Sequence, residues 1–166
     1  MKNLLVLAAV LCAAPAVHAQ TYDANLDGFQ EVPPNASPAF GYGEFTLTGT
    51  TFAVTTGSYQ DLLGNSTVIT VNDAAVGSNG TSLFQLTLDS PGTTTGTFSG
   101  SGTLTTGQIT DLNAGNLYVN LRSNVFPSGE IRGQIEAAPE PSTWALMLGG
   151  LGVLALFGFR AARPVA

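Results

Sequence analysis

Histidine, cysteine and lysine are all missing between Gln20 and Ala138 of this 166-residue chain. The only cysteine, Cys12, and the only histidine, His18, stand in the first 19 residues. Residues 20–138 therefore have no disulfide, no thiolate nucleophile, no imidazole base and no histidine or cysteine ligand for a metal ion. Because acid–base and nucleophilic catalysis usually depend on these groups, the sequence predicts a domain that is not an enzyme and has no catalytic, metal or cofactor site.

Cationic residues are also scarce in this part of the sequence. Ten aspartate and glutamate residues stand against two arginines, Arg122 and Arg132, so the formal charge of residues 20–138 is −8. A surface of this sign repels phosphate backbones and anionic lipid head groups. The composition therefore argues against nucleic acid as a partner and against peripheral binding to a membrane.

The first 19 residues have the parts of a secretory signal peptide. A lysine gives a positive start, residues 4–14 form an apolar run, and Ala19 places a small residue where signal peptidase reads the chain. We expect a signal peptide over residues 1–19, cleaved by signal peptidase between Ala19 and Gln20. A lipoprotein with Cys12 as the lipidated residue is disfavoured, because leucine precedes this cysteine where a lipobox has a small residue.

The sequence after Ala138 changes character again. Pro139-Glu140-Pro141 comes first, and residues 143–159 carry no charge. As a helix, this stretch rises about 25 Å and just crosses a bilayer core, so a transmembrane helix is expected at about 143–159. Trp144 stands where an interfacial aromatic belongs, and Arg160 and Arg163 are expected to hold the C-terminus in the cytoplasm. The domain is then expected outside, in an inner-membrane intermediate.

The tail, residues 139–166, resembles the PEP-CTERM sorting signal of Gram-negative bacteria, in which Pro-Glu-Pro precedes a hydrophobic helix and a basic end. The resemblance implies an exosortase as partner, a membrane cysteine protease that cuts near the Pro-Glu-Pro. It also implies transfer to the cell surface or to the exopolysaccharide matrix of a biofilm. The alternative is a plain C-terminal anchor, which has no need of two prolines and a glutamate at its start.

The middle of the sequence has the pattern of one all-β domain. Apolar residues recur at every second position in short runs bounded by Gly, Asn, Pro or Ser, as in antiparallel strands with one buried face. These runs contain Phe45/Leu47, Phe52/Val54, Phe84/Leu86/Leu88, Leu117/Val119/Leu121 and Ile131/Ile135. Residues 106–112 differ, because the spacing of Ile109 and Leu112, a hydroxyl that can cap the start and the glycine at 115 predict one short helix. Strands at this spacing predict a Greek-key β-sandwich, with a tight corner or an edge at the glycine-rich residues 96–107.

Four segments of this domain resemble a known family. They are Glu31-Val32-Pro33-Pro34, the run from Asn79 to Leu86, the run from Gly115 to Asn120, and the closing run from Phe126 to Ile135. Together they resemble the CHRD domain, the module named after chordin, over about residues 22–136. The resemblance implies an immunoglobulin-like or superoxide-dismutase-like β-sandwich over residues 20–138.

The CHRD family usually carries a His-x-His pair and a further histidine. An ungapped alignment places these positions on Ile69, Val71 and Arg122, so all three histidines are missing here. Residues two apart share one face of a strand, so an imidazole pair can converge on a metal ion, whereas Ile69 and Val71 can only fill space. We therefore expect this chain to lack any metal role that those histidines have in relatives.

The segment from Asp23 to Gly28 has two interpretations. Asp23, Asn25 and Asp27 before a glycine fit the opening of a calcium loop, but the twelfth position is Pro34 instead of glutamate. A strand that turns these polar residues outward is the preferred interpretation.

Two further groups of residues also fit either structure or function. The arrangement of Glu130, Arg132 and Arg122 predicts a cross-strand ion pair. An active site is disfavoured, because it needs a nucleophile and a base within reach, and no histidine stands here to serve as the base. Three tyrosines fit a sugar-stacking face, although partly buried tyrosines of a sandwich are the commoner case. They are Tyr42, Tyr59 and Tyr118.

The sequence as a whole predicts an exported, non-enzymatic protein of the cell surface or exopolysaccharide matrix. The alternative is a specific binding module for polysaccharide or for an envelope protein. A third class is a metal-binding enzyme like superoxide dismutase, which the missing histidines disfavour.

Overall fold

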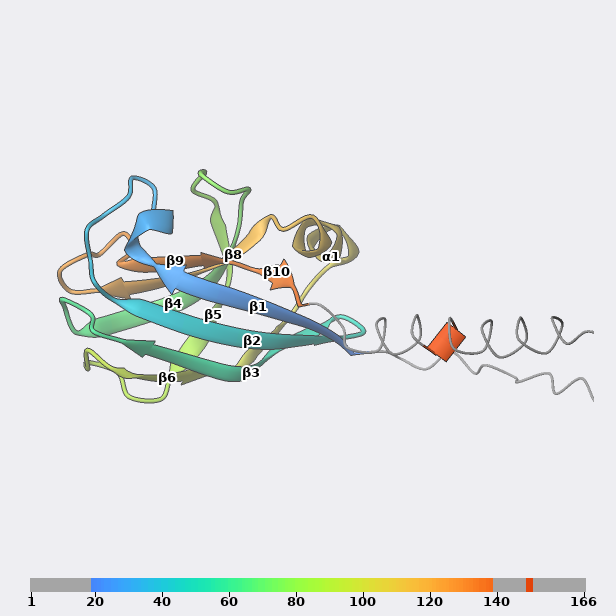
Figure 1. Ribbon diagram of the computed structural model, residues 1–166, viewed down its shortest axis with the longest axis horizontal. Helices are drawn as coiled ribbons and strands as arrows, with labels where there is room; N and C mark the ends of the chain where they lie inside the picture. The colour runs from blue at the N-terminus through green and yellow to red at the C-terminus, as the bar shows by residue number, and fades with distance from the viewer. Residues whose placement is uncertain (1–18, 139–148, 151–166) are drawn as a thin grey trace, which may run out of the picture.

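The computed structural model describes residues 19–138 and 149–150, and the first of these ranges consists mainly of β-strands (Figure 1). In chain order its elements are β1 (Gln20–Asp27), the short 3₁₀ turn η1 (Gly28–Gln30), β2 (Phe40–Thr48), β3 (Thr51–Gln60), β4 (Ser66–Asp73), β5 (Thr81–Leu88), β6 (Gly96–Ser99), β7 (Ser101–Thr103), α1 (Thr106–Asn113), β8 (Leu117–Ser123), β9 (Ile131–Gln134) and β10 (Glu136–Ala137). The predictions of an all-β domain and of a short helix within it are confirmed.

The strands form a sheet that closes on itself. Neighbours follow the order β1-β2-β3-β6-β5-β4-β8-β9, and β9 pairs back to β1 through Arg132 and Asp27. In the order β3-β6-β5-β4, three consecutive strands lie beside the strand that precedes them, which is a Greek-key arrangement. Closure pairs the edge strands of the sheet and makes it barrel-like. The division into the two sheets of a sandwich stays a prediction.

The interior of the barrel contains the apolar residues that alternate along the strands. Phe45 of β2 and Phe52 of β3 stack with ring centroids 5.1 Å apart, and Tyr22 of β1 meets Phe52 edge-on at 6.0 Å. The alternating residues of β8 and those around β9 are fully buried, namely Leu117, Val119, Leu121, Ile131 and Ile135. Burial of each such side chain contributes about 1.5–3 kcal/mol, so this alternation holds the fold together.

The helix α1 begins and ends as its sequence predicts. Thr105 accepts a hydrogen bond from the backbone N–H of Gln108, and the Gln108 side chain accepts one from the backbone N–H of Thr105. This capping box satisfies two amide donors at the start of the helix. Gly115 takes a φ of 72° just beyond the end, and the buried Leu112 fixes the helix against the barrel.

The glycine-rich segment forms the predicted tight corner. A Cβ on Gly102 of β7 would lie 2.5 Å from the ring of Phe84 on β5, so only glycine lets that ring pack against the strand. The alternative of an edge does not apply to β6, because β6 lies between β3 and β5 in the closed sheet, whereas β7 pairs with β3 alone and is an edge.

The two ends of the domain lie side by side. Tyr22 of β1 pairs with Ala137 of β10, and the N–H of Ala138 donates to the carbonyl of Thr21 at 3.0 Å. Figure 1 shows this end opposite the loops that join β1 to β2 and β8 to β9. Ala19 and Gln20 are exposed and Gln20 begins β1, so a cut between them leaves all of β1 in the domain.

The other predictions on the two termini lie outside the described residues. They concern the signal peptide within residues 1–18, the transmembrane helix at about 143–159, and Pro139, Glu140, Pro141, Trp144, Arg160 and Arg163. In residues 19–138 and 149–150, no helix has the length and apolar character needed to cross a bilayer.

Candidate binding site on the outer face of the barrel

The outer face of β4 and β8 carries polar side chains that are nevertheless buried. Apolar residues of both strands point into the core, so the residues between them, including Thr70, Asn72, Tyr118 and Asn120, point outward. Asn72 lies opposite Tyr118, and Thr70 lies opposite Asn120. None of the four is more than 6% exposed, because loops cover this face of the sheet.

The covering loops are held to the sheet by hydrogen bonds. The N–H of Gly80 donates to the hydroxyl oxygen of Tyr118 at 3.1 Å, and Asn79 Nδ2 donates to the carbonyl of Val32 at 2.7 Å. The chain between β4 and β5 is thereby tied both to β8 and to the segment that follows η1. The pairing of β4 with β5 shifts register between Val71 and Asn72, where Leu83 of β5 is an extra residue, and such bulges are common beside binding sites.

A cavity of about 330 Å³ opens between these loops and the sheet, and we call it the polar cavity. Three buried polar atoms of its lining have no hydrogen-bond partner, namely Oδ1 of Asn72, Oδ1 of Asn120 and Nε of Arg122. Its full lining is Val32, Asn72, Asn79, Gly80, Tyr118, Asn120, Arg122, Pro127 and Ser128. Buried polar groups usually find a partner, so this concentration of unpaired atoms marks the polar cavity as the candidate site.

Arg132 lies beside the polar cavity and holds the neighbouring strands and loop together. Its guanidinium carbon lies 3.5 Å from the centre of the Tyr118 ring, and its nitrogens donate to the carbonyls of Ser78 and Ala75 at 2.8 and 3.3 Å. Gln134 supports it by accepting a further bond on Oε1 at 3.2 Å. Burial lowers the pKa of Arg132, partly offset by Tyr118 and Glu31. Arg132 thus connects β9, β8 and the β4–β5 loop.

Glu31 and Arg132 both line a second cavity, of about 340 Å³. The exposed side chains of Phe29 and Val76 stand at its rim. Glu31 is 5% exposed as a residue, and its Oε1 is buried without a hydrogen-bond partner. Loss of solvation raises its pKa to about 7, although Arg132, a backbone hydrogen bond and Arg122 act in the opposite direction. Near neutral pH the protonated and the charged form of this carboxyl are therefore both populated.

This raised pKa predicts a pH-dependent stability that Glu31→Gln removes. From pH 4.5 to about 7 the folded chain binds more protons at Glu31 than the unfolded chain, so the contribution of this group to stability is fully present below pH 4.5 and is lost as the pH rises through this window. We expect the free energy of unfolding of Glu31→Gln to exceed that of the parent chain by about 1–2 kcal/mol at pH 8, after allowance for partial solvent screening. Near pH 4 the two free energies should be equal. Urea unfolding at both pH values measures the two gaps.

The control for Glu31→Gln is Glu136→Gln, which removes one exposed carboxylate at the other end of the domain. It reports the effect of losing a negative charge as such from an acidic protein. If Glu31→Gln is more stable than the parent chain by the same amount at pH 4 and at pH 8, the pH dependence of stability does not come from the Glu31 carboxyl.

The predicted ion pair between Glu130 and an arginine is wrong. Glu130 is fully buried and accepts hydrogen bonds from the Ser37 hydroxyl and from the Leu63 N–H, whereas Arg132 donates to the β4–β5 loop. The two side chains bond to different loops. The sequence pattern of a single strand does not show which loops will approach it. Oε1 of Glu130 accepts from one hydroxyl and one backbone N–H while its Oε2 has no partner, and loop carbonyls accept the hydrogen bonds of Arg132.

The positions that the alignment assigned to the family's histidines do not converge. Ile69 and Val71 are fully buried in the core, as predicted, whereas Arg122 lines the polar cavity on the outer face. Asp23, Asn25 and Asp27 lie on β1 with their neighbours Ala24 and Leu26 buried, so the preferred strand interpretation is confirmed. Among residues 19–138 and 149–150, no three acidic, histidine or cysteine side chains group to hold a metal ion.

The three tyrosines do not share a sugar-stacking face. Tyr59 is buried and bonds to Ser66, Ser90 and Thr93, and Tyr118 is buried beneath Arg132. Tyr42 is 38% exposed on β2. Two of the three tyrosines are thus fully buried and one is exposed, so neither a shared face nor a set of partly buried tyrosines describes them.

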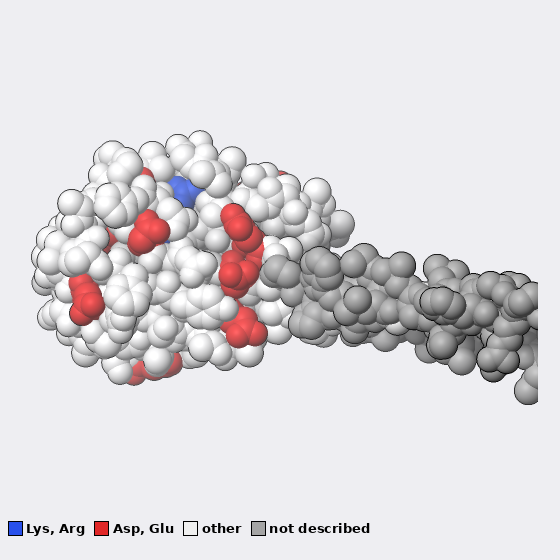
Figure 2. Space-filling model, in the orientation of Figure 1, with Lys and Arg blue, Asp and Glu red and all other residues white. Residues whose placement is uncertain are grey.

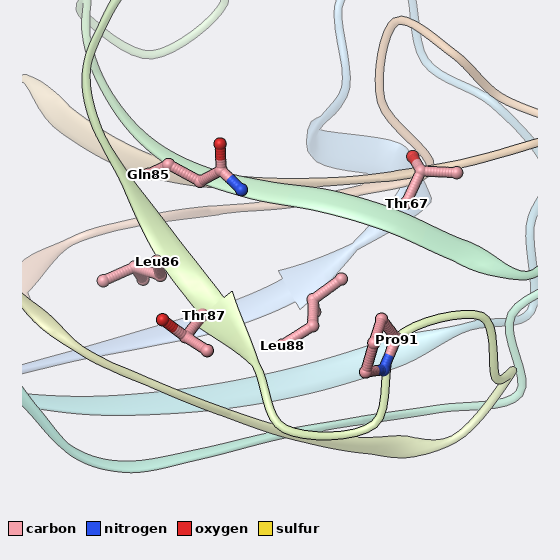
Figure 3. Close-up of a pocket in the computed structure, with 6 residues that line it drawn as sticks. All are labelled: Thr67, Gln85, Leu86, Thr87, Leu88 and Pro91. Atoms are coloured by element: carbon pink, nitrogen blue, oxygen red, sulfur yellow. The ribbon is translucent and has the colours of Figure 1, made fainter.

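Another surface pocket, about 330 Å³ in volume, lies along β5 (Figure 3). It is lined by Thr67, Gln85, Leu86, Thr87, Leu88 and Pro91. None of these residues has a buried polar atom without a partner, so the pocket carries no comparable signal. Figure 2 shows scattered acidic side chains and little cationic surface on the face drawn there.

Sequence reasoning missed Asn72, Asn120 and Glu31. Asn72 and Asn120 stand at alternate positions in strands whose other residues are apolar, and a surface-facing asparagine in such a strand is unremarkable by itself. Their significance depends on the loops that bury them.

Comparison with known proteins identifies two parts of the chain. Residues 22–135 match the CHRD domain family, and residues 137–163 match the PEP-CTERM protein-sorting motif. No curated protein and no solved structure matches the chain. The sorting motif indicates an exported protein that an exosortase processes for the cell surface of a Gram-negative bacterium. The chain therefore belongs to the CHRD domain family, and its CHRD domain is followed by a PEP-CTERM sorting motif.

Proposed function

We propose that this chain is a non-enzymatic protein of the cell surface or the exopolysaccharide matrix. The observation that carries the proposal is the position of the sorting motif, which starts at residue 137, where β10 pairs with β1 after β9 has closed the barrel. Cleavage near Pro139-Glu140-Pro141 would then leave the whole barrel intact. The membrane would hold the chain through its tail only until that step.

The chemistry of the domain supports a role in holding or coating. Residues 20–138 have no histidine and no cysteine, and the unpaired atoms of the polar cavity belong to two amides and one guanidinium. These groups donate and accept hydrogen bonds, but none of them is a nucleophile with a neighbouring base. The arrangement suits non-covalent binding.

Deletion of the exosortase tests the sorting role. We expect the deletion strain to retain the chain at its unprocessed length in the inner membrane and to lose its surface display, and replacement of Pro139-Glu140-Pro141 by alanines to do the same. Glu136→Gln, which changes a carboxylate just before the motif, serves as the control and should be sorted normally. Unchanged size and unchanged display in the deletion strain contradict the proposal.

The polar cavity favours a second candidate, in which the domain is also a specific binding module for polysaccharide or an envelope protein. Retention of the mature protein on the producer's own polysaccharide supports this candidate, and free passage on every fraction counts against it. A superoxide-dismutase-like sandwich with bound metal is the third class. Stoichiometric copper or zinc in untagged protein is the result that supports it.

A further inference from the structure

We propose that the polar cavity binds one acidic sugar residue, a hexuronate, through Asn72, Asn120 and Arg122. The inference deepens the binding role proposed above, and it does not depend on exosortase processing. The site lies on the outer face of β4 and β8, beneath the loops that follow β4 and β8, and no covalent step is involved.

The unpaired atoms define what the ligand has to offer. Oδ1 of Asn72 and Oδ1 of Asn120 need hydrogen-bond donors, and each amide nitrogen already faces a carbonyl, of Gly80 at 3.4 Å and of Ser128 at 3.5 Å. Nε of Arg122 needs an acceptor. A sugar hydroxyl donates to an amide oxygen, and a carboxylate is the acceptor that pairs most strongly with a guanidinium.

The spacing of these residues fits one sugar ring. Asn72 and Asn120 are diagonal neighbours across β4 and β8, and such pairs lie about 7–8 Å apart, comparable to one pyranose with its hydroxyl groups. Asn120 and Arg122 share one face of β8, about 7 Å apart. The cavity of about 330 Å³ stands at the lower end of the usual range for ligand sites, so it has space for a single residue of a chain.

Charge distinguishes an acidic sugar from a neutral one. Arg122 and Arg132 are the only cations in residues 20–138, and both belong to this face. Arg132 is occupied by Tyr118 and by loop carbonyls, whereas Nε of Arg122 is buried without an acceptor. In a domain with ten acidic residues, none hydrogen-bonds to this Nε. The cavity therefore presents a donor whose best partner is an anionic group from outside.

Titration calorimetry of the full chain in detergent tests the inference with three probes: sodium glucuronate, glucose and sodium acetate. We expect glucuronate to bind at least tenfold more tightly than either of the others, because only glucuronate satisfies both the amide oxygens and Arg122. Equal binding of acetate overturns the inference in favour of an adventitious anion. Equal binding of glucose overturns the acidic specificity. Absence of saturable binding up to about 10 mM, a concentration tenfold above a dissociation constant of about 1 mM, overturns the inference and means that the cavity holds water only.

Two variants locate the binding. Asn120→Asp replaces an amide by a carboxylate of the same shape beside the ligand, and Arg122→Gln removes the cation at a half-buried position. Each is expected to weaken glucuronate binding at least tenfold. Gln85→Glu is the matched control, because it makes the same amide-to-acid change two strands away, and its affinity should stay within twofold. Retained binding in folded Arg122→Gln overturns the site even if Asn120→Asp fails to fold. Normal sorting with no glucuronate binding refutes this inference alone.

Discussion

Replacement of Arg132 by methionine is expected to lower the free energy of unfolding by about 2–4 kcal/mol. The change leaves the carbonyls of Ala75 and Ser78 without their charged donor and removes the contact with the Tyr118 ring. Relief of the desolvation that lowers the Arg132 pKa offsets part of this loss. The lost hydrogen bonds outweigh that relief, because the carbonyl of Ser78 has no other donor and that of Ala75 keeps only the N–H of Ser78 at 3.1 Å. Urea unfolding at pH 7 measures the difference.

Arg122→Met is the control, since it removes the same charge from the neighbouring strand without breaking a side-chain hydrogen bond of Nε. Its expected cost is under about 1 kcal/mol. Arg132→Lys should recover less than half of the loss, because one ammonium does not reproduce the fork that contacts two carbonyls and a ring. Equal costs for Arg132→Met and Arg122→Met contradict the role of Arg132 as the connection between β8, β9 and the β4–β5 loop.

Gly80→Ala is expected to cost about 3 kcal/mol or more and to displace the loop that covers the polar cavity. A Cβ at this position overlaps the backbone oxygen of Asp73, and backbone does not yield as a flexible side chain does. The shift also separates the Gly80 N–H from the Tyr118 hydroxyl. Thermal unfolding measures the cost, and glucuronate titration measures the effect on the cavity.

Gly77→Ala in the same loop provides the control. A Cβ there meets open space, but the φ of 76° is one that alanine adopts only with strain, so we expect a cost of about 1 kcal/mol. Similar costs for the two alanine variants would show that the close approach of Gly80 to Asp73 does not hold the loop in place.

The sequence predicted local structure well where one strand face or one helix turn decides it. Leu117, Val119 and Leu121 alternate into the core as their spacing indicates, and α1 begins after Thr105 with the expected hydroxyl cap. In both cases the deciding contacts lie within a few residues or on one face of a strand.

The candidate site could not be predicted from the sequence, because segments that lie far apart in the sequence form it together. Glu31 is buried by the approach of η1 to β9, and Asn72 and Asn120 are buried by the loops after β4 and β8. The wrong ion pair has the same cause, since Glu130 and Arg132 bind to loops distant in sequence. Closure of the sheet between β1 and β9 is likewise a contact between the two ends of the domain.

The most direct test of the account is the intact mass of the mature protein isolated from the surface of producing cells. We expect a chain that begins at Gln20 and ends near Pro139-Glu140-Pro141, with any group added by the exosortase as extra mass on that end. A surface protein that retains residues 143–163 contradicts processing by an exosortase, and with it the proposed route from the membrane to the cell surface or matrix.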